Sequence, residues 1–193
     1  MEKFRFQRLS IPDVIKVTLC RFGDERGYFM ETYAAHIYAQ GGISATFVQD
    51  NQSLSALPGV IRGLHFQTPP KAQAKLVRVV SGAIFDVAVD IRRGSPTYGH
   101  WCATTLTAQG AEQMFIPKGF AHGFCTLQPD TLVTYKLDDY FDAEADTGVL
   151  WSSPTLSIDW PLDGIQPIVS AKDAAMTDFA EFISPFVYEG ASS

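Results

Sequence analysis

Residues 74–91, "AKLVRVVSGAIFDVAVDI", decide the class of fold. Two runs rich in valine and isoleucine lie on either side of Ser81-Gly82, and such residues favour β-strands. A glycine-containing pair between two strands predicts a β-hairpin. Alternation in the first run places Lys75 on the same face as Val77, so we expect its ammonium group to share the apolar interior. The alternative is that Lys75 starts the strand and extends into water.

Short segments of the same character recur along the chain: "HWCATTLTA" (100–108), "QMFIPKGFAHGFCTL" (113–127) and "TLVTYKLDDYF" (131–141). Many short strands separated by turn signals predict an antiparallel sandwich or barrel. Helix signals are few, at "ETYAAHIYAQGG" (31–42) and "KDAAMTDFAEFI" (172–183). We therefore expect an all-β jelly roll as a single domain over 1–193. It would comprise an N-terminal arm (1–50), a core (51–160) and a C-terminal tail with a short helix (161–193).

Composition excludes several classes of protein. The net charge is −6, which argues against a general nucleic-acid binder, because those proteins usually present a basic face. No apolar run approaches the roughly 20 residues of a membrane span, and the N-terminus shows no secretory signal. Three cysteines without CxxC spacing indicate free thiols rather than a zinc cluster. We expect a cytoplasmic protein that binds neither membrane nor nucleic acid.

The stretch "GVIRGLHFQ" (59–67) reads as a buried strand but contains Arg62 and His65. Buried charge is costly unless it is paired, so these residues indicate a binding or catalytic site. The imidazole can take and return a proton near neutral pH, and a carboxylate usually orients such a ring. The candidates for that carboxylate are Asp86, Asp90 and Asp173. Arg62 and His65 would lie on opposite faces of a regular strand. If both serve one ligand, either Gly63 permits a bulge or Arg62 lies at the entry of the strand.

The segment "PKGFAHGF" (117–124) resembles the second motif of the cupins, in which the histidine that matches His122 often binds a metal. The earlier cupin motif usually supplies two more histidines and a carboxylate. Here Gln67 stands at the second histidine position, and Lys75 stands where a carboxylate would be expected. An ammonium group would repel a metal ion, so we expect no metal. Organic acid–base chemistry fits better, with Lys75 stabilising a negatively charged oxygen.

Two further segments are rich in groups that bind polar ligands. "DERGYFMETY" (24–33) contains Arg26 and Glu31, and "FVQDNQS" (47–53) contains adjacent amide and carboxylate side chains. Each could equally be a solvated turn or a strand end. Arg26 and Arg62 suit bidentate binding of a phosphate. Tyr135 is placed by alternation on one face of its strand and is a candidate acid, although a strand tyrosine is more often core filling.

Taken together, six motifs resemble the dTDP-4-dehydrorhamnose 3,5-epimerase family: "FGDERGYFMETY", "FVQDNQS", "GVIRGLHFQ", "AKLVRVVSGAIFDVAVDIRRGSPTYG", "IPKGFAHGF" and "YKLDDYF". They occur in unchanged order between about residues 11 and 173. The resemblance implies a cofactor-independent homodimer with a cupin-like fold. It also implies inversion of C3 and C5 of dTDP-4-dehydro-6-deoxy-D-glucose, on the route to dTDP-L-rhamnose.

The resemblance also implies roles for individual residues. His65 would be the base, oriented by Asp173; Lys75 would stabilise the enolate oxygen and Tyr135 would return a proton to the opposite face. An N-terminal arm exchanged between subunits would complete each site. The positions that match ligand contacts are Arg26, Glu31, Gln49, Asp50, Asn51, Arg62, His122, Asp146 and Lys172. Asp146 stands where the family usually has glutamate, which shortens the reach of that contact.

Three alternatives to a double epimerase follow from the same motifs. A mono-epimerase acting only at C3 or only at C5 can retain the same base and acid. A ketoisomerase of another dTDP-deoxysugar pathway would use similar groups. A non-catalytic sugar-binding jelly roll would not need a base, an enolate donor and an acid together, which makes it the weakest of the three.

Overall fold

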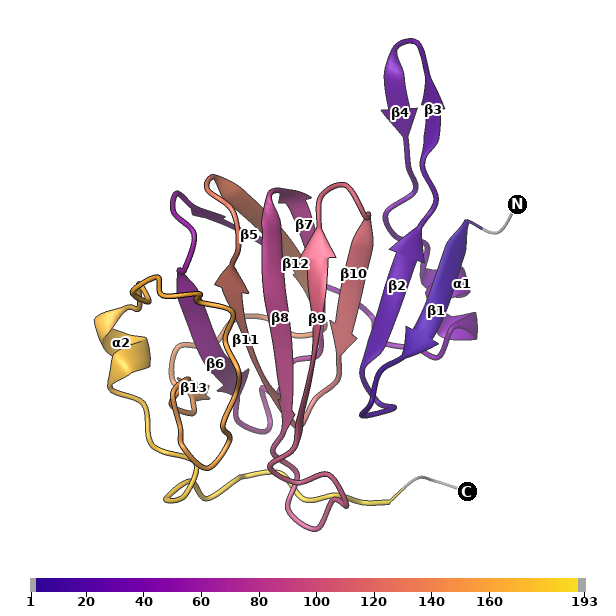
Figure 1. The fold of residues 1–193 in the computed structure, drawn as a ribbon. Helices are drawn as coiled ribbons and strands as arrows, with labels where there is room; N and C mark the ends of the chain where they lie inside the picture. The colour runs from indigo at the N-terminus through magenta and orange to yellow at the C-terminus, as the bar shows by residue number, and fades with distance from the viewer. Residues whose placement is uncertain (1–2, 191–193) are drawn as a thin grey trace.

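The computed structural model describes residues 3–190 as two facing antiparallel sheets (Figure 1). The larger sheet has the order β1 (Phe4–Arg8), β2 (Ile15–Leu19), β10 (Glu112–Ile116), β7 (Lys75–Ser81), β12 (Thr131–Leu137), β5 (Gln49–Ser55). The smaller has the order β13 (Asp146–Gly148), β6 (Ile61–Gln67), β11 (Phe120–Thr126), β8 (Ala83–Asp90), β9 (Trp101–Thr107). This two-sheet arrangement confirms the predicted all-β jelly-roll sandwich.

The two strands predicted in residues 74–91 are confirmed as β7 and β8, but the predicted hairpin between them is wrong. β7 pairs with β10 and β12, whereas β8 pairs with β9 and β11 in the other sheet. Ser81 and Gly82 therefore form a corner that carries the chain from one sheet to the other. Gly82 has a φ of 80°, and a side chain there would lie 2.3 Å from the hydroxyl of Thr131. The corner needs glycine because it combines a left-handed conformation with close packing.

Three apolar layers follow from the period-two alternation of the strands. Val77 and Val79 point between the sheets, together with Ile84 and Ala88 of β8. The outer face of the six-stranded sheet is covered by the N-terminal segment and α1 (Ala35–Gln40). The outer face of the five-stranded sheet is covered by the C-terminal segment. The space between the sheets is therefore continuous apolar core except where polar side chains interrupt it.

The N-terminal segment both joins the sandwich and extends beyond it. β2 pairs with β10, so the first two strands belong to the larger sheet. The predicted helix after residue 31 is confirmed as α1, which ends at Gly41 and buries Tyr38. Between these elements, β3 (Phe22–Asp24) and β4 (Gly27–Phe29) pair only with each other among the described strands, and they project away from the sheets (Figure 1).

The helix predicted at 172–183 is largely wrong, because α2 covers only Ala171–Ala174. The hydroxyl of Ser170 caps it by accepting a hydrogen bond from the Asp173 amide at 3.0 Å. Beyond α2 the backbone bonds to other segments, as where the Leu150 amide donates to Thr177. Phe179 and Phe182 have helical spacing, yet they pack on the sheet without a helix. Among residues 3–190, no helix is long and apolar enough to cross a membrane.

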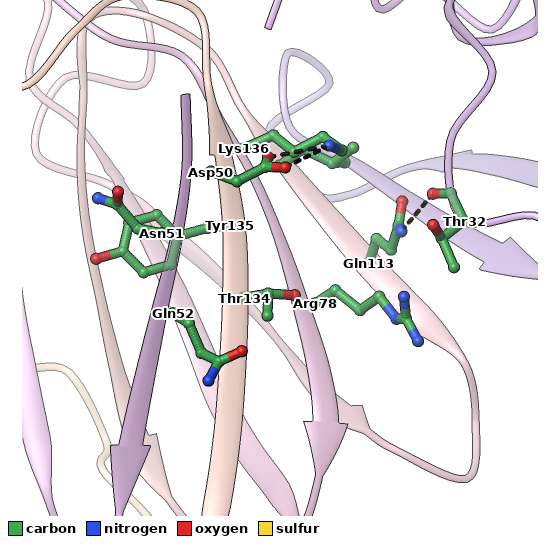
Figure 2. Close-up of a pocket in the computed structure, with 10 residues that line it drawn as sticks. Thr32, Asp50, Asn51, Gln52, Arg78, Gln113, Thr134, Tyr135 and Lys136 are labelled. Atoms are coloured by element: carbon green, nitrogen blue, oxygen red, sulfur yellow. Dashed lines mark hydrogen bonds and ion pairs between the residues drawn. The ribbon is translucent and has the colours of Figure 1, made fainter. Parts of the chain in front are cut away.

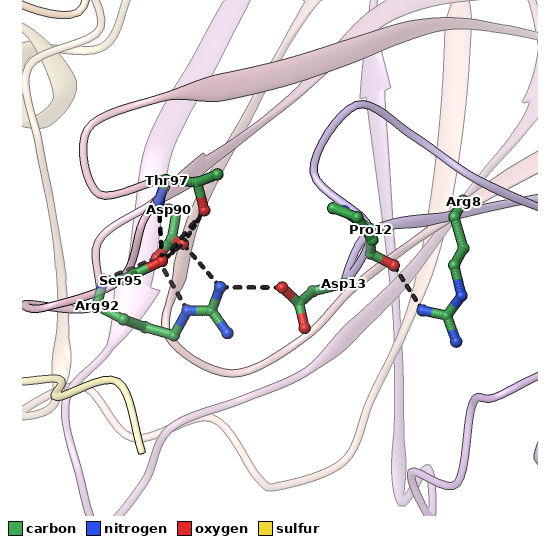
Figure 3. A network of polar contacts seen from close by, with 7 residues as sticks. All are labelled: Arg8, Pro12, Asp13, Asp90, Arg92, Ser95 and Thr97. Atoms are coloured by element: carbon green, nitrogen blue, oxygen red, sulfur yellow. Dashed lines mark hydrogen bonds and ion pairs between the residues drawn. The ribbon is translucent and has the colours of Figure 1, made fainter. Parts of the chain in front are cut away.

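A buried carboxylate at the end of β8 anchors a network of polar contacts that reaches Asp13 in the N-terminal segment (Figure 3). Asp90 accepts hydrogen bonds from Arg92, Ser95 and Thr97 at 2.6–2.9 Å. Arg92 also pairs with Asp13 at 3.1 Å and lies 4.9 Å from the ring centre of Tyr188. Burial alone would raise the pKa of Asp90, but these hydrogen bonds outweigh it and hold that pKa below its usual value.

Asp90→Asn should lower the free energy of unfolding by about 2–4 kcal/mol, because Arg92 would lose a buried charged partner. The pKa of Asp90 is lower in the folded chain than in the unfolded chain. Its contribution to the free energy of unfolding is therefore fully present above about pH 3.9 and is lost as the pH falls through the pKa of the folded state. Urea unfolding between pH 7 and pH 3 should therefore show a smaller acid-induced loss for the variant than for wild type. Asp13→Asn is the control, expected to cost less than about 1 kcal/mol because Asp13 is half-exposed.

Candidate active site

A pocket of about 480 Å³ opens between the two sheets. It receives side chains from β6 and β11 of the smaller sheet and from β5, β7 and β12 of the larger one. Residues 168–173 form a further wall. The full lining is Ser53, Val60, Ile61, Arg62, His65, Lys75, His122, Phe124, Tyr135, Ile168, Val169, Ser170, Lys172 and Asp173. All four predicted catalytic residues therefore meet in one cavity.

His65 on β6 is held by Asp173 on α2. The imidazole Nε2 lies 2.7 Å from Asp173 Oδ1, and the second oxygen of Asp173 accepts a hydrogen bond from the Gly63 amide. Burial lowers the pKa of His65, while the hydrogen bond and charge of Asp173 act in the opposite direction. The net effect keeps His65 neutral near pH 7 and leaves its other ring nitrogen free to accept a proton. Of the three candidate carboxylates, Asp173 is therefore the one that contacts His65, whereas Asp86 contacts His122 and Asp90 contacts Arg92.

An irregularity at Gly63 brings Arg62 and His65 to the same pocket. The pairing of β6 with β11 shifts register between His122 and Phe124, so the strand is not regular at this point. Gly63 has a φ of 120°, and a side chain there would lie 2.6 Å from the carbonyl oxygen of His122. The expected bulge is confirmed, and glycine is required because the neighbouring backbone approaches too closely for any side chain.

Lys75 points into the pocket, which confirms the prediction from alternation. Its Nζ donates a hydrogen bond to the backbone oxygen of His65 at 3.2 Å. Burial lowers the pKa of Lys75 to about 8, while the negative charges of Asp146 and Asp86 act to raise it. The ammonium form is therefore held in place by nearby carboxylates rather than by water. Such a group is suited to stabilise a developing oxyanion.

Tyr135 and His65 line the pocket from different sheets. Tyr135 lies on β12 of the larger sheet, where it is opposite Asn51 on β5 and packs against the inter-sheet core. His65 lies on β6 of the smaller sheet. A ligand between the sheets would thus meet an imidazole on one side and a phenol on the other.

His122 forms a second pair with a carboxylate. It is directly opposite His65 in the register of β6 and β11, and its Nε2 lies 2.7 Å from Asp86 Oδ1. Asp86 is fully buried. The partnership of these two residues is not visible in the sequence, because it depends on how β8 and β11 pair. Ser53 also lines the pocket and was missed, although alternation from Asn51 would have placed it on the inward face.

The cupin-type metal position is occupied differently in this chain. The Gln67 side chain faces a loop, where its amide donates to the backbone oxygens of Lys71 and Tyr140 and its oxygen accepts from Asp142. Within residues 3–190, no group of three or more His, Cys, Asp or Glu side chains is arranged to hold a metal ion. The expected independence of metals and cofactors stays a prediction.

The predicted binding residues do not all lie in this pocket. Arg62, His122 and Lys172 line the pocket, and Lys172 forms an ion pair with Asp146. On β5, Gln49 donates to Asn51 at 2.9 Å.

Three other predicted residues lie elsewhere. Asp50 pairs with Lys136 on the outer side of the sheet. Arg26 pairs with Asp24 in the projecting hairpin, and Glu31 pairs with Lys3. Neither Arg26 nor Glu31 lines the pocket of its own chain.

A second pocket of about 370 Å³ adjoins the first at Tyr135 (Figure 2). It is lined by Asp50 and Asn51 of β5 and by Arg78 of β7. Figure 2 shows the Asp50–Lys136 ion pair at one side and a hydrogen bond from Gln113 to the Thr32 backbone at the other. This pocket places part of the predicted binding shell on the face toward which the N-terminal segment runs.

Comparison with known proteins finds relatives that match most of the chain. The family model described as dTDP-4-dehydrorhamnose 3,5-epimerase matches residues 8–181. A protein of that name from Sinorhizobium fredii is 44% identical, over 97% of this chain and 96% of that relative. The crystal structure of dTDP-6-deoxy-D-glucose-3,5-epimerase from Legionella pneumophila, in complex with dTDP-4-keto-L-rhamnose, superposes with a TM-score of 0.92. It is 41% identical and covers 97% of this chain and 100% of its own. The crystal structure of a Bacillus anthracis dTDP-4-dehydrorhamnose 3,5-epimerase with TDP and PPi bound gives a TM-score of 0.87 at 46% identity. The match covers 91% of this chain and 99% of that chain.

Proposed function

Because this chain belongs to the dTDP-4-dehydrorhamnose 3,5-epimerase family, we propose that it inverts C3 and C5 of dTDP-4-dehydro-6-deoxy-D-glucose to give dTDP-4-dehydro-L-rhamnose. Both carbons are adjacent to the C4 ketone, so removal of either proton produces an enolate on the C4 oxygen. The single observation that carries the proposal is that His65 and Tyr135 line one pocket from opposite sheets. Inversion requires a base on one face of the sugar ring and an acid on the other, and this arrangement supplies both.

The proposed cycle has the same steps at each carbon. Neutral His65 takes the proton, and Asp173 stabilises the imidazolium that forms. The electron pair of the broken C–H bond moves onto the C4 oxygen, where the Lys75 ammonium group stabilises it. Tyr135 then gives its hydroxyl proton to the opposite face of the carbon, and the ketone reforms. Solvent restores the proton on Tyr135 and removes the one on His65 before the second inversion.

Incubation with dTDP-4-dehydro-6-deoxy-D-glucose in D2O tests the proposal by NMR. We expect deuterium at both C3 and C5, because each proton passes through a group that exchanges with solvent. Deuterium at one carbon alone would indicate a mono-epimerase, and deuterium at neither would refute the enzymatic proposal. EDTA should leave the rate unchanged; a strong loss would restore the metal hypothesis.

We further propose that the chain acts as a homodimer whose projecting N-terminal hairpin reaches into the partner's site. This hairpin exposes three aromatic side chains: Phe22 is 39%, Tyr28 58% and Phe29 67% exposed. Exposure of neighbouring aromatic side chains to water is unfavourable unless another surface covers them. Arg26 lies at the tip of the same hairpin. A two-chain site would explain why this predicted phosphate ligand lies outside the pocket of its own chain.

Coexpression of two weakened variants tests the exchange of arms. A hybrid dimer of His65→Ala and Arg26→Ala subunits would contain one site with both residues intact if arms are exchanged. Activity should then rise well above that of either parent, to about a quarter of wild type for random pairing. No gain over the Arg26→Ala parent would show that each site is built from one chain. Light scattering should give the mass of a dimer for both parents.

A further inference from the structure

The pair formed by His122 and Asp86 has no role in the cycle above, yet it is built into the pocket wall. Asp86 is 0% exposed, and its Oδ2 has no hydrogen-bond partner among residues 3–190. A buried carboxylate with one unbonded oxygen is costly unless a positive charge lies near it. A cation in the pocket would offset this cost.

Lys75 is the cation that fits this position. Asp86 lies on β8 with its side chain on the same inward face as Ile84 and Ala88. Lys75 reaches the same space from β7 in the opposite sheet. The negative charges of Asp146 and, to a smaller extent, Asp86 act to raise the pKa of Lys75 against the larger effect of burial. Arg92, the nearest arginine along the chain, is committed to Asp90 instead.

Lys75 is surrounded by groups of both charge signs. The carboxylates are Asp86 on β8, Asp146 on β13 and Asp173 on α2, and the other ionisable side chains without a carboxylate are His65, His122 and Tyr135. Arg62 and Lys172 line the same pocket but are exposed to water. Asp146 is itself ion-paired with Lys172, and Asp173 is hydrogen-bonded to His65. Asp86 is the most deeply buried carboxylate of this set, and its second oxygen is buried without a hydrogen-bond partner among residues 3–190.

We propose that Asp86 is a positioning residue of the reaction, which fixes His122 against the pocket wall and supplies a buried negative charge that acts together with Asp146 to favour the protonated form of Lys75. The inference rests on the proposed function, because the protonated Lys75 is the group that stabilises the enolate. His122 can then meet the ligand only through its remaining ring edge, since Asp86 holds Nε2. Asp86 thus orients His122 and contributes to the charge state of Lys75.

The protonation of Lys75 can be measured without substrate. Trace acetylation with acetic anhydride, followed by peptide mass spectrometry, reports the fraction of free amine at each pH. The midpoint for Lys75 should lie near pH 8 in wild type. In Asp86→Asn it should fall by about one pH unit, because a nearby negative charge is removed while the side-chain shape is kept. An unchanged midpoint would overturn the proposal even if the chain proves to be an epimerase.

Kinetics give a second readout that a merely structural role would not change. In Asp86→Asn, the pH at which kcat/KM falls on the alkaline side should decrease by the same amount, and the pH at which it falls on the acid side should not change. Asp90→Asn is the matched control, because it also removes a buried carboxylate from the inward face of β8. It should lower stability but leave both the alkaline limb and the acetylation midpoint at wild-type values.

If Asp86→Asn does not fold, His122→Gln carries the test. This variant retains the charge of Asp86, so the acetylation midpoint of Lys75 should stay near pH 8, and a fall of one pH unit would contradict the proposal. If the acetylation midpoint of Lys75 shifts in Asp86→Asn but the wild-type protein exchanges no sugar protons, the proposed function is refuted and the role of Asp86 toward Lys75 is not.

Discussion

His65→Ala should abolish deuterium exchange at C3 and C5 together, with a fall in turnover of about 10³-fold. The reason is that both carbons lie beside the same ketone and are proposed to lose their protons to the same base. Asp173 cannot replace the imidazole, because it is buried behind the ring and bonded to the Gly63 amide. Proton NMR of the substrate in D2O measures both positions in one experiment.

The control is His100→Ala, which makes the same change at an exposed loop residue outside the pocket. It should exchange both protons at the wild-type rate. Retained exchange at either carbon in His65→Ala would contradict a single-base mechanism and would direct attention to His122, which lies directly opposite on β11. Binding of dTDP should survive in both variants, because His65 is not proposed to hold the nucleotide.

The same residues predict the pH dependence of the reaction. His65 must be neutral to act as a base, and burial keeps its pKa below the ordinary value of 6.5. The rate should therefore fall only on the acid side of that value. Lys75 must be charged, and its pKa of about 8 should set the alkaline limb. A bell-shaped kcat/KM between these limits would report the free enzyme's base and its enolate-stabilising cation.

Local sequence rules predicted the strands and the direction of their side chains. Alternation placed Lys75 and Val77 on the inward face, and the misfit of Arg62 with His65 pointed to a bulge at Gly63. These predictions hold because they depend on a few consecutive residues and on the period of two. That His65, Lys75, Tyr135 and Asp173 would share one site was predicted from the resemblance to a family, because no local rule says which distant residues come together.

Predictions that depend on distant partners were less successful. Ser81-Gly82 has the composition of a hairpin turn, but burial of β7 and β8 in different sheets decides their pairing. Phe179 and Phe182 have helical spacing, but they find apolar contacts on the sheet without helical backbone. Spacing alone left three aspartates open as the partner of His65, because the answer joins residues 108 positions apart.

Tyr135→Phe should separate proton removal from inversion. His65 and Lys75 are unchanged in this variant, so the enolate can still form and deuterium can still enter from the side of His65. The hydroxyl that would deliver a proton to the opposite face is missing, so the carbon should regain deuterium with its original configuration. We expect exchange at a reduced rate and a fall in the epimerised product of about 10²-fold or more.

The substitution leaves the fold intact for a physical reason. The ring of Tyr135 packs against the inter-sheet core, and phenylalanine preserves that packing while only the hydroxyl is lost. Tyr98→Phe, at a half-buried tyrosine outside the pocket, is the matched control and should epimerise normally. Loss of exchange together with inversion in Tyr135→Phe would mean that the phenol helps to form the enolate rather than to protonate it. Retained inversion would assign the acid to another group. It would contradict the proposal that His65 and Tyr135 act on opposite faces of the sugar ring.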